Sequence, residues 1–291
     1  MAEPHEKIPA FVNPLAGSAD AARAALANAD RFDLREIAPD KLADAIATAS
    51  KKGSRRILVS GGDGTIATAA SAVLGTETEL AILPGGTLNH FSTDLGIPPD
   101  AADALALAAS GSVRPVDVGV VNGRLFLNTS SVGAYVHFVR TREYLEPRFG
   151  YHIASTIAAL RILFQLRLLA VEVEVDGMRR VYRTPVVFIG VGERELQLPV
   201  LGKRIPDGKR GLHVMVVNGR SAGRVLALGL NAVARGVKTA SRSPELDSFI
   251  VDRCVITVRQ SSTVAVDGEL VRLGAPLEYK LERDAIRVVC P

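Results

Sequence analysis

The chain has 291 residues, of which 47% are hydrophobic and 23% are charged, a composition typical of globular proteins that excludes general disorder. At about 150 residues per domain, this length predicts two domains. The 35 basic and 31 acidic residues give a net charge of +4, which is too small for a nucleic-acid-binding surface. Tryptophan is absent and aromatic residues make up only 5%, so stacking on single-stranded nucleic acid is also disfavoured.

Cysteine usage and hydropathy indicate a soluble, cytoplasmic protein. Cys254 and Cys290 are too few for a disulfide framework and fit a reducing compartment. The first residues lack the basic and apolar regions of a signal peptide. The most apolar long segment, Ile153–Val171, contains two arginines and a glutamine, which spoil a membrane span. We therefore expect no transmembrane segment.

The first part of the chain alternates between predicted strands and predicted helices. Strands are predicted at Ile8–Asn13, Arg56–Ser60 and Leu80–Leu83, and helices at Ser18–Ala29, Lys41–Ser50, Ile66–Leu74 and Pro99–Ser110. Ser18 is a candidate N-cap, and Asp100 suits the first turn of its helix. Alternation at this spacing favours a parallel sheet covered by helices on both faces. The fold class is therefore α/β, with a first domain at residues 1–120.

The remainder of the chain, residues 121–291, is predicted to form a second, mainly antiparallel β domain. The strand pattern changes after Arg114, and from there the predicted strands are Val116–Val121, Arg124–Thr129, Val171–Val175, Val181–Thr184, Val186–Val191, Val214–Val217, Cys254–Arg259, Thr263–Val266 and Ala285–Val289. Asn122-Gly123 and Asp176-Gly177 are hairpin turn signals. Helices are predicted at Tyr151–Leu169 and Ser221–Lys238. The boundary between the domains falls between Gly111 and Asn122.

The sharpest local feature is Gly61-Gly62-Asp63-Gly64-Thr65, which follows a buried strand and precedes a helix. Glycines let the backbone turn and approach a ligand closely, and the N–H groups of the following helix suit a phosphate. Asp63 could orient a Mg²⁺–phosphate unit or bind neighbouring backbone, and Thr65 could cap the helix or donate to a phosphate. The run is neither a Walker A loop nor a GxGxxG fingerprint. A plain glycine turn is the alternative.

Two further loops follow predicted strands. One runs from Pro84 to Phe91 and includes Gly86, Thr87 and Asn89; the other is Asn13-Pro14-Leu15-Ala16-Gly17-Ser18. In open α/β sheets, ligands bind at the carboxyl ends of the strands. Each loop alone could be a tight turn, whereas three loops at one sheet edge predict a binding site.

Near the end of the chain, Asp267 and Glu269 flank a glycine at the end of a strand. A positioned carboxylate can accept the proton of an attacking hydroxyl group, as phosphoryl transfer requires. A hairpin turn built on Asp267-Gly268 is the alternative, and it is favoured when the motif is taken by itself.

Taken together, these motifs resemble the diacylglycerol kinase catalytic-domain family, which includes bacterial lipid kinases, sphingosine kinases and ceramide kinases. The matching pieces are Asn13-Pro14, Gly61 to Thr65, Gly86-Thr87-Leu88-Asn89 with His90-Phe91, and Asp267-Gly268-Glu269, in the family's order. The glycine–aspartate–glycine core is shared with NAD kinases, whereas the Thr-Leu-Asn-His-Phe continuation points to the lipid kinases.

The resemblance implies an α/β nucleotide-binding domain joined to a β-sandwich domain that binds lipid, with the active site in the cleft between them. It also allows the last residues of the chain to return to the first domain. ATP phosphates would lie over Gly61 to Thr65, with Asn13 and Thr87 lining the nucleotide site. Asp267 and Glu269 would be the candidate general base for a lipid hydroxyl group that attacks the γ-phosphate. Mg²⁺ would bridge the phosphates, and Asp63 would reach it through them.

Two segments depart from the family pattern. After the glycine loop the family usually continues with an Asn-Glu pair, where this chain has Ile66-Ala67-Thr68-Ala69. Bacterial members often carry acids, tied to a structural Mg²⁺, where this chain has Lys209-Arg210-Gly211-Leu212-His213-Val214. Because Lys209 and Arg210 stand where acidic metal ligands were expected, the sequence disfavours that structural Mg²⁺ site.

The sequence therefore predicts an ATP- and Mg²⁺-dependent lipid kinase that acts on diacylglycerol or a related lipid and visits a membrane surface transiently. The basic loop from Lys203 to Arg210 could contact anionic headgroups, and a solvated face is the equal alternative. An NAD kinase-like enzyme and a catalytically silent relative that binds lipid or nucleotide remain alternative functions. Whether the chain forms a homodimer is open.

Overall fold

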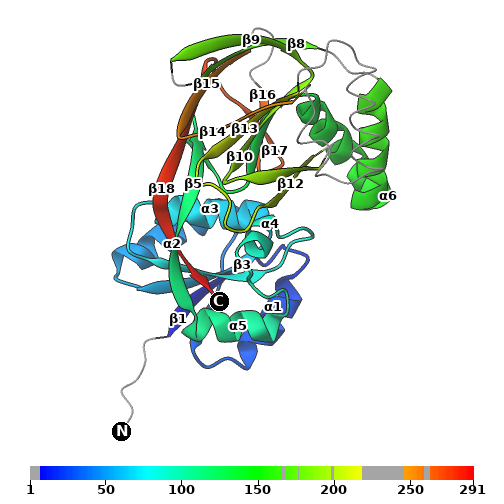
Figure 1. The fold of residues 1–291 in the computed structure, drawn as a ribbon. Helices are drawn as coiled ribbons and strands as arrows, with labels where there is room; N and C mark the ends of the chain where they lie inside the picture. The colour runs from blue at the N-terminus through cyan, green and yellow to red at the C-terminus, as the bar shows by residue number, and fades with distance from the viewer. Residues whose placement is uncertain (1–6, 165–167, 176, 198–199, 218–245, 259–262) are drawn as a thin grey trace. The chain divides into compact units, whose positions relative to one another are not determined.

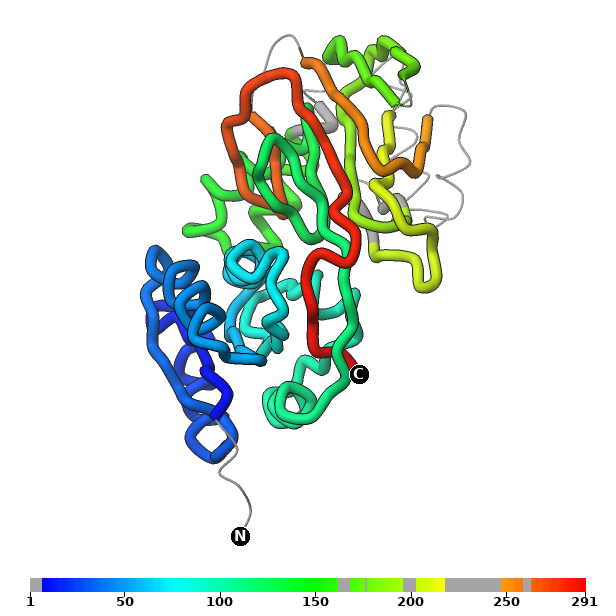
Figure 2. Tube along the Cα trace, turned by 90° about the vertical axis from the view of Figure 1, so that its left-hand side faces the viewer, coloured from blue at the N-terminus to red at the C-terminus, as the bar shows by residue number. Residues whose placement is uncertain are grey.

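The protein is described by a computed structural model that covers residues 7–164, 168–175, 177–197, 200–217, 246–258 and 263–291 (Figure 1). The chain divides into two compact units: unit 1 is residues 1–118 with 282–291, and unit 2 is residues 119–281. The chain leaves unit 1 within strand β5 (Ser112–Val121) and returns within strand β18 (Leu277–Cys290). These two strands pair with each other, as the tube in Figure 2 shows.

Unit 1 is built on a parallel sheet in which the strands follow the order β2-β1-β3-β4-β18. The first four are β1 (Ile8–Val12), β2 (Phe32–Glu36), β3 (Arg56–Gly61) and β4 (Glu79–Pro84). All five residues of β1 are buried, as are five of the six in each of β3 and β4. Continuous burial of this kind is expected where helices cover both faces of a parallel sheet.

Two helices cover each face of this sheet (Figure 1). Helices α1 (Ala19–Ala27) and α5 (Ala101–Ser110) pack together on one face. Helices α2 (Leu42–Lys51) and α3 (Asp63–Val73) pack together on the other. The short elements η1 (Pro39–Lys41) and α4 (His90–Asp94) complete the unit. The arrangement puts the loops after β1, β3 and β4 at one edge of the sheet.

Unit 2 is a β-sandwich whose two sheets bury one shared apolar core. One sheet is antiparallel throughout, in the order β14-β13-β10-β7-β16-β17. These strands are β7 (Thr129–Gly133), β10 (Val186–Val191), β13 (Leu212–Val217), β14 (Leu246–Val251), β16 (Thr263–Val266) and β17 (Glu269–Arg272). The other sheet joins the unit 2 part of β18 to β15 (Arg253–Val258), β8 (Leu169–Val175) and β9 (Met178–Thr184), with β6 (Arg124–Phe126) beside β5.

A small hairpin and one long helix complete unit 2. The hairpin is β11 (Arg194–Gln197) with β12 (Val200–Arg204). Helix α6 (Ala134–Phe164) is kinked at Gly150, where φ is 72°, three residues after Pro147. Its first part packs against β16 and β17 through an apolar cluster that includes Val136 and Val139. No helix among the described residues is long and apolar enough to cross a membrane.

The predicted α/β fold class, with a parallel sheet followed by an antiparallel sandwich, is confirmed. Several elements escaped prediction, among them β2, the first half of α6 and α4. Strand β2 buries only its first residue and three of its five residues are charged, so it lacks an apolar run. The first half of α6 is masked in the sequence by Pro147 and Gly150, which usually end helices. Helix α4 is only one turn long. The helix predicted at Ser221–Lys238 lies outside the described residues.

Candidate functional site

The three loops that follow β1, β3 and β4 meet at the carboxyl edge of the sheet in unit 1. The Gly85 N–H donates to the Gly61 carbonyl oxygen at 2.9 Å. A Cβ atom added to Gly86 would lie 2.5 Å from the Gly62 Cα, and one added to Gly85 would lie 2.5 Å from the Ser18 Oγ. Only glycine fits where backbones approach this closely, so the glycine runs are required for the loops to meet.

The amino end of α3 is open at this edge. Its N-cap is Gly62, and no side chain caps the helix. The first N–H groups of an α-helix have no partners within the helix. They therefore remain available for an anion, and the helix dipole adds a partial positive charge at the same point. Thr65 does not cap the helix; its side chain instead lies against Gly61.

Asp63 joins the second loop to the third. Its two carboxylate oxygens accept hydrogen bonds from the backbone N–H groups of His90, at 3.2 Å, and Phe91, at 3.1 Å. These groups form the amino end of α4, so Asp63 acts as a distant cap for that short helix. The sequence allowed Asp63 either to orient a Mg²⁺–phosphate unit or to bind neighbouring backbone, and the structure shows the contact with the backbone.

The asparagine side chains of the other two loops hold the shapes of their own loops. Asn89 has a left-handed backbone with φ 48°, and its amide both accepts from the Gly86 N–H at 2.9 Å and donates to the Gly86 carbonyl at 2.8 Å. The Asn13 Oδ1 accepts from the Leu15 N–H at 3.0 Å. Pro14 is half-buried in the first loop, and Thr87 is exposed in the third. Thr87 is thus the hydroxyl side chain of this edge that faces solvent.

Asp267 and Glu269 belong to unit 2, where Asp267 is the first residue of the two-residue turn that joins β16 to β17 and Glu269 is the first residue of β17. Asp267 and Gly268 have φ values of 47° and 84°, and Val266 pairs with Glu269 across the hairpin. Positive φ at both central residues is the signature of a type I′ turn. The turn reading of this motif is therefore correct, and the carboxylates are presented by a rigid hairpin.

The Asp267 carboxylate is used to hold the backbone. It accepts from the N–H groups of Leu127 at 2.7 Å, Asn128 at 2.8 Å and Thr129 at 2.9 Å. The Asp267 N–H in turn donates to the Thr129 carbonyl at 2.7 Å. These bonds fix the start of β7 against the turn. Hydrogen bonds to an ionised carboxylate are stronger than neutral ones, so this anchor is stiff.

Glu269, by contrast, is exposed over 57% of its side chain, and among the described residues it forms an ion pair with Arg124 alone, at 3.3 Å. The sequence reading did not single out Arg124, because a lone arginine near Asn122-Gly123 carries no motif. Tyr135 packs between Phe138 and Phe188, and burial raises its pKa to about 12, so its hydroxyl stays protonated at neutral pH.

His213 lies in the segment that departs from the family pattern. Its Nδ1 accepts from the Arg194 N–H at 3.0 Å, and its Nε2 pairs with the Ser248 Oγ at 2.7 Å. Burial lowers the pKa of His213, which keeps the ring neutral. Direct hydrogen bonds to both ring nitrogens thus hold β13 to its neighbours.

The side chains of unit 1 fit phosphate better than they fit a bare metal ion. Within the described part of the chain, no group of three acidic, histidine or cysteine side chains could hold a metal. Asp63, the predicted metal contact, has both oxygens engaged by backbone N–H groups. Mg²⁺ in kinases is usually bound by substrate phosphates, water and one or two carboxylates. The described residues of unit 1 therefore offer backbone N–H groups for a phosphate and no cluster of three metal-binding side chains.

Comparison with known proteins shows what the first unit resembles. Residues 7–121 match the model of the diacylglycerol kinase catalytic domain. The first unit is therefore similar to a diacylglycerol kinase catalytic domain. The resemblance inferred from the glycine loops is thereby confirmed.

Two curated relatives match mainly this region. A Pseudomonas aeruginosa protein named "Probable lipid kinase YegS-like" is 43% identical over 103 residues, which cover 35% of this chain and 31% of the relative. The diacylglycerol kinase of Bacillus subtilis is 34% identical over 125 residues, 42% of this chain and 41% of the relative. This chain thus spans less than half the length of these two relatives.

Solved structures extend the likeness to the whole fold. The structure of a diacylglycerol kinase from Bacillus anthracis superimposes with a TM-score of 0.71 at 25% identity and covers 98% of this chain and 97% of that chain. A second structure from that organism gives a TM-score of 0.75 at 24% identity. Both units therefore have the architecture of that enzyme.

Proposed function

We propose that this protein is an ATP-dependent lipid kinase that transfers the γ-phosphate of ATP to a hydroxyl group of diacylglycerol or a related lipid. The observation that carries the proposal is the cradle of unit 1, in which Gly62 and Gly86 bring two loops together beside the open amino end of α3. Such an end binds phosphate through backbone N–H groups and needs no lysine from a Walker A motif. The family match and the names of the relatives support the same reaction.

In this proposal the residues of unit 1 bind and orient the nucleotide. The backbone of Gly61 to Thr65 receives the phosphates, while Asp63 holds the neighbouring loop in place through α4. Thr87 can donate its exposed hydroxyl group to a phosphate oxygen. Mg²⁺ bound with the nucleotide would offset the charge that develops during transfer.

Within the carboxylate pair, Glu269 is the better general base and Asp267 a positioning residue. A base needs a free lone pair and room for the hydroxyl group whose proton it accepts. The Asp267 oxygens already accept three backbone hydrogen bonds, whereas Glu269 is half-exposed and, within the described part of the chain, pairs with Arg124 alone. Glu269 would accept the proton of the lipid hydroxyl group, and Arg124 would hold the glutamate side chain in one orientation.

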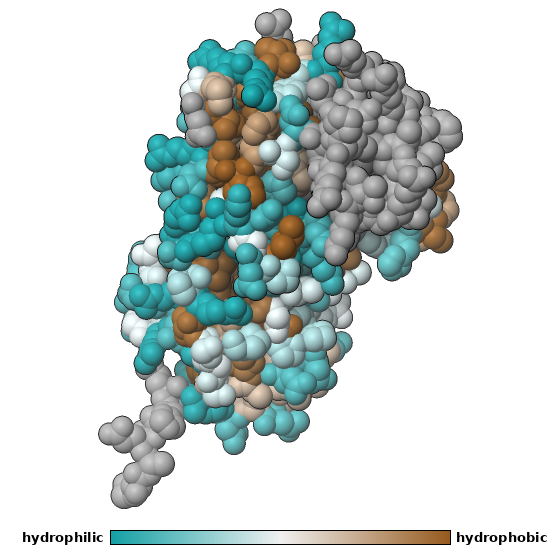
Figure 3. Space-filling view, viewed as in Figure 1, coloured by the Kyte–Doolittle hydropathy of each residue, from teal (hydrophilic) through white to brown (hydrophobic). Residues whose placement is uncertain are grey.

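The lipid substrate requires contact with a membrane, and the second half of α6 offers a surface for it. Phe149, Ile153, Ile157 and Leu160 lie at helical spacing and are 38 to 55% exposed; Figure 3 shows hydrophobic side chains at the outer edge of the α6 region. The segment 148–161 also carries Arg148 and Arg161 and no acidic residue. Apolar side chains flanked by arginines favour a membrane with anionic lipids.

The reaction is tested by incubating the protein with γ-labelled ATP and vesicles that contain diacylglycerol. We expect labelled lipid from the wild type and a loss of at least about a hundredfold in kcat for Glu269→Gln, the scale of general-base catalysis. The matched control is Glu174→Gln, which removes a carboxylate on β8 that is likewise ion-paired with an arginine. Equal activity of wild type and Glu269→Gln would refute the base assignment, and phosphorylation of NAD in place of lipid would refute the proposed substrate class.

The membrane surface is tested separately with Ile153→Ser and Leu160→Ser. We expect both variants to lose activity on long-chain lipid in vesicles and to keep it on a short-chain, water-soluble diacylglycerol. Val181→Ser on β9 is the matched control, because Val181 is an apolar side chain with 73% exposure outside α6. A loss of activity on both substrates would mean that the α6 side chains serve the fold or the acceptor pocket and not the membrane.

A further inference from the structure

A cavity of about 390 Å³ lies in unit 1 at the amino ends of the sheet strands. It is lined by the start of β1, the start of β3, the start of β4 and the end of α5. Its charged residues are Lys7, Arg31, Arg55, Arg56 and Glu79. Four cations therefore surround one carboxylate.

The single carboxylate is fully committed to the fold. Glu79 is buried, and its two oxygens accept from the Arg55 Nε at 3.0 Å and the Arg56 Nε at 2.7 Å. Arg56 also donates to the carbonyl oxygens of Ala108 at 2.8 Å and Gly111 at 3.2 Å. Arg56 and Glu79 thus form the floor of the cavity, and Glu79 has no capacity left to neutralise further cations.

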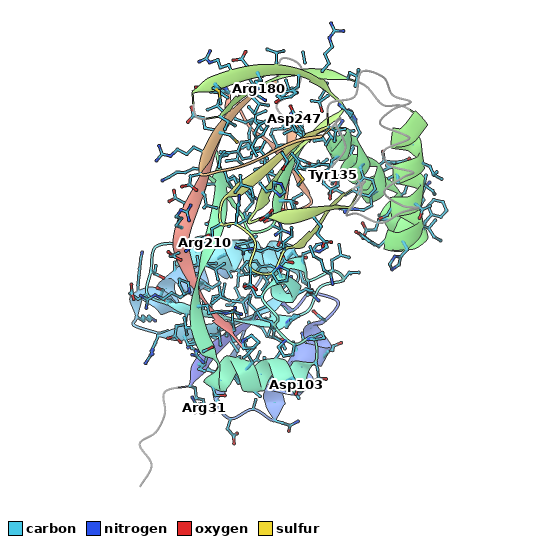
Figure 4. All side chains as sticks on the ribbon, viewed as in Figure 1. Arg31, Asp103, Tyr135, Arg180, Arg210 and Asp247 are labelled. Atoms are coloured by element: carbon cyan, nitrogen blue, oxygen red, sulfur yellow. The ribbon has the colours of Figure 1, made fainter. Side chains whose placement is uncertain are left out.

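The other cations at the rim are available to a ligand. The Ile8 N–H donates to the Arg31 carbonyl oxygen at 2.8 Å, which keeps Lys7 and Arg31 beside each other at the foot of β1, where Figure 4 labels Arg31. Both side chains are exposed, and neither forms an ion pair or side-chain hydrogen bond in the described part of the chain. Arg55 is 88% exposed and uses only its Nε, so its two terminal nitrogens can donate.

We propose that this cavity binds the phosphate group of an anionic ligand, supplied by a lipid phosphate at a membrane or by a free phosphate compound. Two guanidinium groups and an ammonium group at the rim of one cavity offer the donors that a dianionic phosphate takes. The volume suits a headgroup or a small phosphate ester. The cavity is separate from the cradle, because the two lie at opposite ends of the same strands, about 17 Å apart for a strand of five or six residues.

The test uses the full chain and two probes. Inorganic phosphate is titrated by calorimetry, and binding to phosphatidylcholine vesicles with and without phosphatidate is measured by co-sedimentation. The test variant is Lys7→Glu/Arg31→Glu. The matched control is Lys51→Glu/Lys52→Glu, which changes the net charge equally at the end of α2, outside the cavity. Thermal melting confirms that both variants fold.

We expect the test variant to weaken binding of at least one probe about tenfold, because charge reversal replaces attraction by repulsion at short range. A loss for vesicles alone supports a lipid source, a loss for inorganic phosphate alone supports a free compound, and a loss for both supports the shared phosphate chemistry. The proposal is overturned if the test variant binds both probes like the wild type, or if the control variant loses as much. None of these outcomes depends on kinase activity.

Discussion

The different roles assigned to Asp267 and Glu269 can be separated by removing one charge at a time. Asp267→Asn keeps the size of the side chain and tolerates the left-handed backbone at φ 47°, since asparagine is the residue that most readily joins glycine there. It removes the negative charge and turns one acceptor oxygen into a donor. The perturbation therefore tests the hydrogen bonds to Leu127, Asn128 and Thr129 without straining the turn.

The expected cost follows from those three bonds. The amide nitrogen faces one backbone N–H that it cannot accept, and an unsatisfied buried donor costs about 1–3 kcal/mol. The other two bonds lose their charge, which removes about 1 kcal/mol each. The sum is about 4 kcal/mol of unfolding free energy. At about 2–4 °C per kcal/mol for a domain of this size, the melting temperature should fall by about 10 °C.

Glu269→Gln should behave in the opposite way. Its ion pair with Arg124 is exposed on both sides, and such pairs contribute about 0–1 kcal/mol, so the melting temperature should change by at most about 4 °C. Calorimetric melting of both variants, with lipid kinase assays below the lower melting temperature, gives the comparison. If Asp267→Asn melts like the wild type but has lost all activity, the anchor reasoning is refuted and Asp267 is the chemical group.

Three further outcomes are expected. Gly86→Ala should abolish nucleotide binding, because its Cβ would lie 2.5 Å from the Gly62 Cα, whereas Gly17→Ala should be silent because nothing lies within 4 Å of its Cβ; nucleotide titration distinguishes them, and equal binding would contradict the close approach. Burial lowers the pKa of His213, so below pH about 6.5 the unfolded chain binds a proton that the folded chain does not bind, and the free energy of unfolding should decrease as the pH is lowered. Urea titrations at pH 7 and pH 5 should show a smaller decrease for His213→Asn than for the wild type. Burial raises the pKa of the Cys254 thiol to about 12, so a thiol reagent should label it only after unfolding, and rapid labelling of the native protein would show that β15 opens.

Local motifs proved readable from the sequence, and long-range pairings did not. The turn at Asp267-Gly268 could be predicted from two neighbouring residues. The glycine loops could be predicted because each glycine run follows a recognisable strand. The partners of Asp63 lie 27 and 28 positions away, and those of Asp267 lie 138 to 140 positions away. No periodicity links such pairs, so only the folded chain shows which donors a carboxylate meets.

Strand length was also underestimated where polar and apolar residues alternate. Strand β18 runs for fourteen residues, yet the sequence predicted only its last part, Ala285–Val289. Its first part pairs with β15 in unit 2, and its last part pairs with β4 in unit 1. The polar residues at Glu282 to Asp284 interrupt the apolar pattern at the point where the chain passes between the units. A strand that packs into two cores does not keep one continuous burial pattern, so the hydrophobic pattern that would have predicted the whole of β18 is interrupted.

From the sequence, a hairpin turn and a general base were alternative interpretations of Asp267-Gly268-Glu269. In the structure the two interpretations are compatible. A general base at a strand end must be held still, and the type I′ turn does this by directing Asp267 onto three backbone N–H groups. In the proposed reaction the Asp267 carboxylate is committed to these three groups, and Glu269 is the less committed carboxylate because, among the described residues, only its Oε2 meets Arg124. The evidence that Asp267 is structural is therefore also the evidence that favours Glu269 as the chemical group.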